Sequence, residues 1–210
     1  MFPDLTRDDV FRLETRRLWL RWPRQADAEA VHRLAGEKSV ADMTASIPYP
    51  YSPDNADAFI LLTRRANMEG RGLTLAITQK AKPGQAIGMV SIAAGADAGA
   101  SLGYWLGQPY WGQGYATEAV QAVADALFTL TTQEALTADA RVINPASRRV
   151  LEKCGFAYQG SGLQDLRARG GRYPVDHFQL TRRTWSSLKS WSREGYAPRM
   201  PEPALPLAAE

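Results

Sequence analysis

Gly103-Tyr-Trp-Leu-Gly-Gln-Pro-Tyr-Trp-Gly-Gln-Gly-Tyr-Ala-Thr-Glu118 is the stretch of the sequence that decides the fold. Its beginning, together with Leu102, is an aromatic run typical of a strand, and a turn containing glycine and proline follows over residues 107–112. From Gly114 onward the apolar residues recur at helical spacing, on a face made by Ala116, Val120, Val123 and Leu127. The stretch therefore predicts a strand that passes through a glycine-rich turn into a helix.

A helix that begins at such a turn favours a bound anion. The first N–H groups of a helix have no partners within it, and the helix dipole adds positive potential there. Gly112 and Gly114 carry no side chain that would keep a phosphate from the backbone. The turn has no lysine and so is not a P-loop, and Thr117 stands where the dinucleotide-binding fingerprint has a small residue. The alternative is a strand–helix corner whose glycines serve packing alone.

Two blocks of the sequence resemble one enzyme family. Residues 110–119, Tyr-Trp-Gly-Gln-Gly-Tyr-Ala-Thr-Glu-Ala, resemble motif A of the GCN5-related N-acetyltransferases (GNAT), in the form of the RimJ/RimL-type branch. Residues 144–156, Asn-Pro-Ala-Ser-Arg-Arg-Val-Leu-Glu-Lys-Cys-Gly-Phe, resemble motif B of the same family. The resemblance implies the GNAT acyltransferase fold, an α/β (α+β) structure. Its mixed, largely antiparallel twisted sheet is splayed at the cofactor cleft and carries helices on both faces.

Composition limits the classes of protein to consider. At 210 residues, with 45% apolar and 22% charged residues, we expect an ordinary globular chain. We predict a single N-acetyltransferase domain over residues 1–185 and a C-terminal helix with a proline-rich tail over residues 186–210. A net charge of +3 suits an anionic cofactor and is too small to argue for nucleic acid.

The expected location is the cytoplasm. No apolar run is long enough to span a bilayer, and the first residues lack the basic and apolar regions of a signal peptide. The single cysteine, Cys154, rules out an intrachain disulfide and suits a reducing compartment. We expect no membrane or nucleic-acid partner, and a homodimer is left open.

The rest of the chain predicts alternating strands and helices. Residues 1–13 predict an arm or short helix, and residues 40–51 predict broken structure or a short helix. Strands are expected over residues 13–20, 73–78, 87–93, 101–106, 135–142, 156–161 and 175–181. Helices are expected over residues 28–36 after an Asp27 cap, 54–68, from Gly114, 144–155 and 186–193. Turns are expected at residues 82–84 and 95–99, and a loop at residues 162–174.

The resemblance also implies acetyl-CoA as the cosubstrate, and no metal. The diphosphate is expected against the backbone N–H groups of Gln113, Gly114, Tyr115, Ala116 and Thr117. The pantothenate arm is expected along the strand of Tyr104, Trp105 and Leu106, where a backbone N–H near Leu106 serves as the oxyanion donor. Asn144 is expected to cap its helix and contact the cofactor, and Ser147 to lie near the sulfur. Core packing is the alternative role of Tyr104, Trp105 and Trp111, and we favour it for Trp105.

The proton acceptor is not evident from the sequence. Many relatives carry a glutamate where this chain has Ser101, and another where it has Gln159. The remaining candidates are Tyr158, Asp176 and His177, of which only histidine titrates near neutrality. We also consider His177 as a strand residue with an ordinary partner, and we expect a base acting through water or no dedicated base. Cys154 is interpreted as a buried structural thiol.

The predicted activity is acetyl-CoA-dependent transfer to a primary amine, with a protein or peptide N-terminus as the acceptor. A small-molecule amine (an amino acid, polyamine or antibiotic) is the first alternative, and a CoA-binding module without catalysis is the second. The loop of residues 162–174 carries Arg167, Arg169 and Arg172, which predict attraction to an acidic acceptor. A solvated surface loop is the alternative interpretation of those arginines.

Overall fold

The computed structural model describes residues 1–95 and 99–193. Its strands are β1 (Arg12–Glu14), β2 (Leu18–Arg21), β3 (Gly72–Gln79), β4 (Lys82–Ala94), β5 (Ala100–Leu106), β6 (Ala135–Arg141), β7 (Ala157–Leu166) and β8 (Gly171–Thr181). Its α-helices are α1 (Ala28–Ala35), α2 (Lys38–Ala41), α3 (Pro53–Met68), α4 (Tyr115–Leu130), α5 (Pro145–Lys153) and α6 (Arg182–Arg193). Short 3₁₀ turns are η1 (Asp4–Thr6), η2 (Gln25–Asp27), η4 (Gln108–Tyr110) and η5 (Arg167–Arg169).

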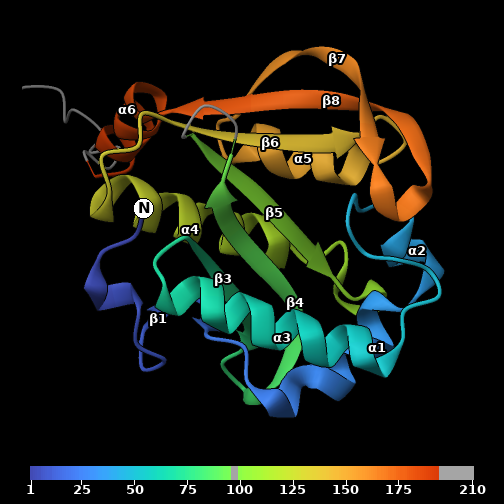
Figure 1. Ribbon diagram of the computed structural model, residues 1–210. Coiled ribbons are helices and arrows are strands. Elements are labelled where there is room, and N and C mark those ends of the chain that lie inside the picture. Colours follow the sequence, from blue (N-terminus) through green and yellow to red (C-terminus); the bar gives the residue numbers. More distant parts are fainter. Residues whose placement is uncertain (96–98, 194–210) are drawn as a thin grey trace, which may run out of the picture.

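The strands form one eight-stranded sheet in the order β1-β2-β3-β4-β5-β6-β8-β7 (Figure 1). Neighbouring strands are antiparallel throughout, except that β5 and β6 pair in parallel. The crossover that a parallel pair requires is supplied by α4, the helix that follows the glycine-rich turn. The predicted mixed, largely antiparallel sheet is confirmed.

Helices cover both faces of the sheet, because its central strands have apolar side chains on each face. Leu102 and Leu106 of β5 belong to a core shared with α4 and α5. Trp105, which points to the opposite face, packs on a second core that contains residues of α1, α2 and α3. Figure 1 shows α3 in front of the sheet and α4 behind it. In the part of the chain that the structure describes, no helix is both long and apolar enough to cross a bilayer.

The sheet is splayed between β5 and β6. These strands pair only where Ala100–Leu102 lies beside Leu136–Ala138, while β5 stays paired with β4 as far as Leu106. Just beyond β5, Gly107 N donates to Ile87 O at 3.0 Å, so the N–H and C=O groups of Gly107 point toward β4. The direction of these groups alternates along a strand. The N–H and C=O groups of Tyr104 and Leu106 therefore point away from β4, into the gap between β5 and β6.

The helix boundaries follow local signals. Gly114, at φ 79°, precedes the first residue of α4, and a residue with a side chain would be strained there. Asn144 Oδ1 accepts from Ser147 N at 3.0 Å, and Pro145 is the first residue of α5, as predicted. Gly155, at φ 86°, lies just beyond the end of that helix.

Three predictions about the secondary structure of the N-terminal half of the chain are wrong. Residues 13–20 form two strands, because a turn after β1 is closed by Leu18 N donating to Thr15 Oγ1 at 2.9 Å. The chain turns at residues 80–81, and residues 82–84 belong to β4 after a register shift. Asp27 does not cap α1, since its carboxylate accepts from Arg24 N at 2.7 Å and pairs with the guanidinium of Arg21.

The loop predicted over residues 162–174 is also wrong, because β7 and β8 continue through it as a hairpin. Leu163 pairs with Pro174 and Asp165 pairs with Arg172, and the chain reverses through η5 and the following Gly170, φ 69°. β7 is an edge strand whose side chains are mostly exposed, so its sequence lacks the apolar alternation of a strand. The last helix starts at Arg182 instead of residue 186, and the part of the predicted helix and proline-rich tail beyond residue 193 lies outside the described residues.

Candidate functional site

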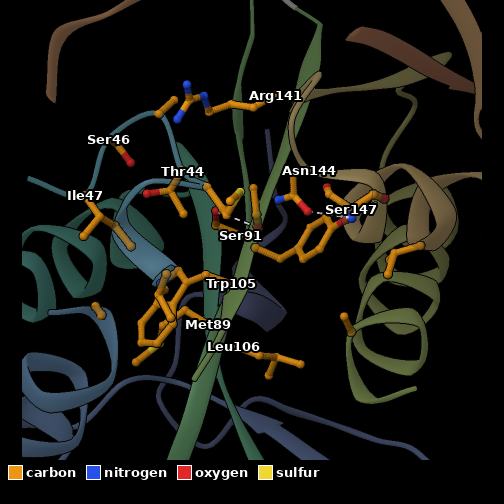
Figure 2. Close-up of a pocket in the computed structure, with 18 of the residues that line it drawn as sticks. Thr44, Ser46, Ile47, Met89, Ser91, Trp105, Leu106, Arg141, Asn144 and Ser147 are labelled. Atoms are coloured by element: carbon orange, nitrogen blue, oxygen red, sulfur yellow. Dashed lines mark hydrogen bonds between the residues drawn. The ribbon is translucent and has the colours of Figure 1, made fainter. Parts of the chain in front are cut away.

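A cavity of about 1040 Å³ lies at the splay between β5 and β6 (Figure 2). Trp105 and Leu106 both line it, although their side chains point to opposite faces of the sheet. Figure 2 shows Thr44 on one side of the cavity and Asn144 and Ser147 on the other, with β5 between them. The cavity therefore passes through the plane of the sheet, so two ligands entering from opposite faces can meet beside Leu106.

The α4 side of the cavity begins at the glycine-rich turn. Gly112 has φ 72° and Gly114 has φ 79°, and a Cβ on Gly112 would meet no atom within 4 Å. The first hydrogen bond of α4 runs from Glu118 N to Gly114 O at 3.1 Å, so the N–H groups before it are not used within the helix. Open backbone and a helix N-terminus fit a diphosphate group. The turn therefore offers backbone donors and space for the phosphate group that the sequence predicts there.

Tyr104 connects β5 to α5 across the gap. Its hydroxyl lies 2.8 Å from Ser147 Oγ and donates to Ser147 O at 3.2 Å. Burial raises the pKa of Tyr104 above its ordinary value, so this hydroxyl keeps its proton at neutral pH. Asn144 fixes the start of the same helix through Ser147 N. This arrangement places two hydroxyl groups beside the gap into which Leu106 N–H points.

Two charged residues of β6 face the opposite side of the cavity. Leu136, Ala138 and Ala140 are buried against α4 and its neighbours, so Asp139 and Arg141 point toward the α1–α3 side, where both line the cavity. One oxygen of the Asp139 carboxylate lies 2.7 Å from His177 Nδ1. Asp139 is not among the residues predicted from the sequence; the alternation of β6 just before the motif B block is the signal that indicates which face it occupies.

The segment of residues 42–50, here called the strap, is tied to the far half of the sheet. Arg141 donates to Asp42 O, and its guanidinium carbon lies 4.9 Å from the ring centre of Tyr173. Arg169 donates to Ala41 O at 2.7 Å and also to Ile47 O, and its side chain is only 9% exposed. Arg169 is therefore committed to the backbone of this region, and the expectation that it attracts an acidic acceptor is wrong.

Most of the residues expected at the cofactor lie together along the cavity. They are Tyr104, Trp105, Leu106, Gly114, Tyr115, Ala116, Thr117, Asn144 and Ser147. Gln113 lies next to them but not on the cavity wall; its carbonyl accepts from Arg17 Nη1 at 2.9 Å. Trp111 is 43% exposed, which contradicts core packing, and its indole N–H donates to Leu106 O at 2.7 Å.

The candidates for the proton acceptor are more dispersed. His177 is not among the residues that line the cavity and reaches it only through Asp139. Ser101 lines the α1–α3 side. Tyr158 hydrogen-bonds to Ser161 at 2.7 Å, and that serine in turn donates to Asp176. The described residues hold no cluster of three or more histidine, cysteine or acidic side chains that could bind a metal.

Cys154 is buried next to α4. Burial raises the pKa of its thiol to about 12, and the thiol donates to Thr117 O at 3.6 Å. A protonated, buried thiol is not a nucleophile at neutral pH. The geometry matches the interpretation of Cys154 as a structural residue.

Comparison with known proteins connects this geometry to a family. Residues 17–157 match the model of the acetyltransferase (GNAT) domain. An uncharacterized N-acetyltransferase, p20, of Bacillus licheniformis is 32% identical over 87 residues, which are 41% of this chain and 49% of that protein. This chain spans about half the length of the curated relatives it matches.

Solved structures have the same fold. Mycobacterium smegmatis RimJ in complex with CoA-disulfide aligns with a TM-score of 0.70 and 23% identity, over 87% of this chain and 94% of that one. RimL, a ribosomal L7/L12 alpha-N-protein acetyltransferase in complex with coenzyme A, aligns with a TM-score of 0.70 and 20% identity, over 81% and 98% of the two chains. At these identities the likeness shows the fold alone.

Proposed function

Because this chain belongs to the GNAT acetyltransferase family, we propose that it transfers the acetyl group of acetyl-CoA to the nitrogen of a primary amine. The observation that carries the proposal is the cavity that crosses the sheet beside Leu106. A cosubstrate on the α4 face and an amine on the α1–α3 face reach the same point there. Holding two reactants in this way removes much of the entropic cost of their encounter.

The cofactor lies along the free edge of β5 and over the start of α4. When bound, acetyl-CoA supplies an acetyl group activated as a thioester. The backbone groups of Tyr104 that face the gap pair with the pantothenate arm, and the turn from Gly112 to Thr117 holds the diphosphate. Leu106 N–H donates to the acetyl carbonyl oxygen, on which negative charge develops during the attack.

The proton of the amine leaves on the α1–α3 side. Asp139, the carboxylate on that wall of the cavity, accepts a hydrogen bond from the acceptor nitrogen and takes up its proton as the new bond forms. His177, 2.7 Å from Asp139, fixes the orientation of the carboxylate. We propose this role of Asp139 as an alternative to the expected base acting through water or absence of a dedicated base, with His177 as a positioning residue.

The departing thiolate receives a proton on the α4 side. Ser147 Oγ donates a hydrogen bond to the sulfur, and Tyr104, 2.8 Å away, holds the Ser147 hydroxyl in place. Burial raises the pKa of Tyr104, so its hydroxyl stays protonated and stabilises the thiolate through this hydrogen-bonded pair, while the sulfur takes its proton from solvent. The thiolate and the base thus stand on opposite faces of the sheet.

The acceptor is a protein or peptide N-terminus, as for the L7/L12 alpha-N-protein acetyltransferase of the same fold. A small amine is the alternative acceptor, and the position of the strap over the cavity supports this alternative. Pinned by Arg141 and Arg169, the strap contributes Thr44, Ser46 and Ile47 to the cavity wall and narrows access from that side. Three other statements remain predictions: the cytoplasmic location, the end of the single domain at residue 185, and assembly as a homodimer.

The test measures CoA release by thiol titration with an amine panel of peptides with free N-termini, amino acids and polyamines, each with an N-blocked control. Turnover with peptides alone supports a protein or peptide N-terminus as the acceptor. Turnover with small amines alone shows that the acceptor is a small amine instead. CoA binding without turnover on any amine overturns the transferase in favour of a binding module. Gly114→Glu, which puts bulk and negative charge at the diphosphate, should abolish CoA binding in calorimetry. Because the positive φ of Gly114 strains any side chain, urea denaturation must first show that the variant is folded; unchanged CoA binding contradicts the cofactor site.

A further inference from the structure

The turn proposed to hold the diphosphate has no basic residue of its own. From Gly107 to Thr117 the chain contains no lysine, arginine or histidine. Backbone N–H groups and the helix dipole offer only partial charges to a group that carries full negative charges. A cation from another part of the chain would complete the site, and one lies beside it.

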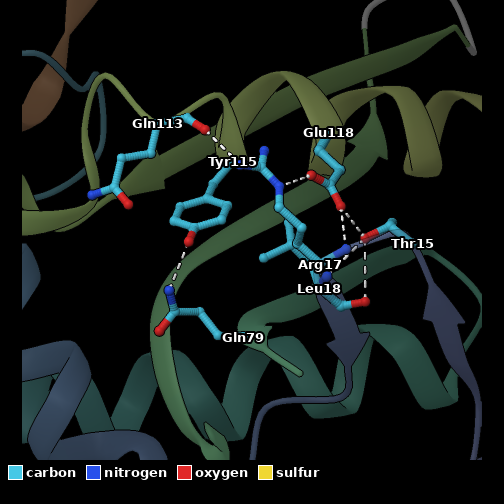
Figure 3. Close-up of polar contacts among 7 residues, drawn as sticks. All are labelled: Thr15, Arg17, Leu18, Gln79, Gln113, Tyr115 and Glu118. Carbon is cyan, nitrogen blue, oxygen red and sulfur yellow. Dashed lines mark hydrogen bonds and ion pairs between the residues drawn. The ribbon is translucent and has the colours of Figure 1, made fainter. Parts of the chain in front are cut away.

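Arg17, in the turn between β1 and β2, reaches this site from 96 residues away (Figure 3). Its Nη1 donates to Gln113 O at 2.9 Å, and its guanidinium carbon lies 4.6 Å from the ring centre of Tyr115. Its Nε donates to Glu118 Oε2 at 2.7 Å. The guanidinium is thus fixed in three directions around the first turn of α4.

The remaining nitrogen of Arg17 is directed at the glycine-rich turn. Nη2 lies 3.4 Å from the position that a Cβ on Gly114 would occupy, and within the described ranges it has no hydrogen-bond partner. The side chain is 37% exposed, so solvent or a ligand can reach it. A glycine at residue 114 leaves that nitrogen uncovered, which is a second reason for glycine at this position besides its positive φ.

We propose that Arg17 is the cationic ligand of the cofactor's diphosphate, donating from Nη2 to a phosphate oxygen held over Gly114. This inference rests on the proposed function, because it assumes that CoA binds at the turn. The bonds from Nε and Nη1 orient the guanidinium before the cofactor arrives, so little side-chain entropy is lost on binding. Glu118 offsets part of the positive charge, but it accepts from Arg17 N and Nε and leaves Nη2 without a partner among the described residues.

The arginines and lysine of α5 are less suited to this role. Arg148 pairs with Glu152 at 2.8 Å, on the outer side of that helix. Arg149 and Lys153 line the cavity from α5, across the gap from the turn. Arg17 is the basic side chain hydrogen-bonded to the turn itself.

The test compares Arg17→Gln with Arg16→Gln, which removes the same charge from an exposed neighbouring residue. Calorimetry would give the dissociation constants of CoA, dephospho-CoA and pantetheine at low and moderate salt. A hydrogen bond between charged groups, discounted for exposure, predicts about tenfold weaker binding of CoA and dephospho-CoA to Arg17→Gln. The loss should shrink as salt rises, and pantetheine, which has no phosphate, should bind both variants alike.

Arg17→Lys tests whether CoA binding depends on the positive charge at residue 17 or on the hydrogen bonds from Arg17 to Gln113 and Glu118. If Arg17 binds phosphate, lysine restores much of the CoA affinity at low salt, even though it cannot make both tethering bonds. Equal CoA affinity in Arg17→Gln and Arg16→Gln overturns the inference, as does a loss that extends to pantetheine and ignores salt. If Arg17→Gln does not fold, Arg17→Lys is used instead. A loss of CoA affinity in Arg17→Lys that changes with salt and spares pantetheine supports the inference, and a loss that ignores salt and extends to pantetheine overturns it. Failure of the wild-type protein to bind CoA would instead refute the proposed function.

Discussion

Replacing Glu118 with glutamine removes a negative charge from the network that holds the start of α4. The carboxylate accepts hydrogen bonds from Thr15 Oγ1 at 2.6 Å and from Arg17 N and Nε, both at 2.7 Å. Its side chain is 17% exposed. Glutamine keeps one acceptor oxygen and turns an N–H₂ group toward donors, so at least one bond is lost without replacement.

The cost follows from the kind of bond lost. A hydrogen bond to a charged group stabilises a folded protein by about 1.5–3 kcal/mol, and partial exposure of Arg17 argues for the lower part of that range, roughly 2 kcal/mol. For a chain of this length each kcal/mol lowers the melting temperature by about 2–4 °C, so we expect a decrease of roughly 4–8 °C.

The effect should depend on pH with a definite sign. Burial alone would raise the pKa of Glu118, but hydrogen bonds from Thr15 and Arg17 and the charge of Arg17 hold it below its ordinary value of 4.5. A lowered pKa means that the stabilisation is present above the unfolded pKa and is lost as pH falls through the folded one. The difference in free energy of unfolding between wild type and Glu118→Gln should therefore be constant from pH 6 to 8. It should shrink as the pH falls into the acid range, where Glu118 becomes protonated.

Urea denaturation across that range, together with a more acidic series, measures this difference. Glu152→Gln is the matched control, because that glutamate pairs with Arg148 on the surface, both side chains being 46% exposed, and its removal should leave the midpoint unchanged. A difference that is absent at neutral pH, or that persists undiminished in acid, would refute the role given to the ionised carboxylate.

Three further predictions concern the cavity and its surroundings. Asp139→Asn should lower kcat by about a hundredfold or more and leave the CoA dissociation constant unchanged, whereas His177→Gln should retain most of the rate; the reverse order would transfer the role of base to the histidine. Arg169→Met should leave the Ile47 carbonyl of the strap without its donor, cost about 2 kcal/mol in urea denaturation and raise the acceptor KM more than that of acetyl-CoA. Cys154, whose pKa is raised to about 12, should react with a thiol reagent at pH 8 only after unfolding; rapid labelling of the native protein contradicts its burial.

The sequence predicts best where a residue acts on its own neighbours. Asn144 caps the helix that follows it, and Gly155 ends it, because a cap or a positive φ is a local requirement. The strand, turn and helix around Gly114 were predictable for the same reason, and the resemblance of the motifs supplied the fold around them.

Some predictions failed because partners distant in sequence decide the structure, whereas the predicted Asp27 cap failed because of its near neighbours Arg21 and Arg24. The hairpin of β7 and β8 is held by pairing at a sheet edge, which leaves few apolar positions to reveal it. Arg169 is buried because Ala41 and Ile47, more than a hundred residues earlier, supply carbonyls for it. Asp139 became a candidate base only when the splay turned its face of β6 into a cavity wall. The hairpin and the partners of Arg169 have no signature in the local sequence, whereas the alternation of β6 shows which face Asp139 occupies but not that this face borders a cavity.

The short parallel pairing of β5 with β6 divides the sheet at one place in space and in sequence. Strands β1 to β5 and helix α4 all precede residue 131, and β6 to β8 all follow residue 134. Each part keeps its own antiparallel hydrogen-bond ladders, and a single covalent connection joins them. The chain is thus organised like a split-protein reporter: cut at the exposed Thr132, it would yield two fragments whose reassociation rebuilds the cavity at their shared boundary.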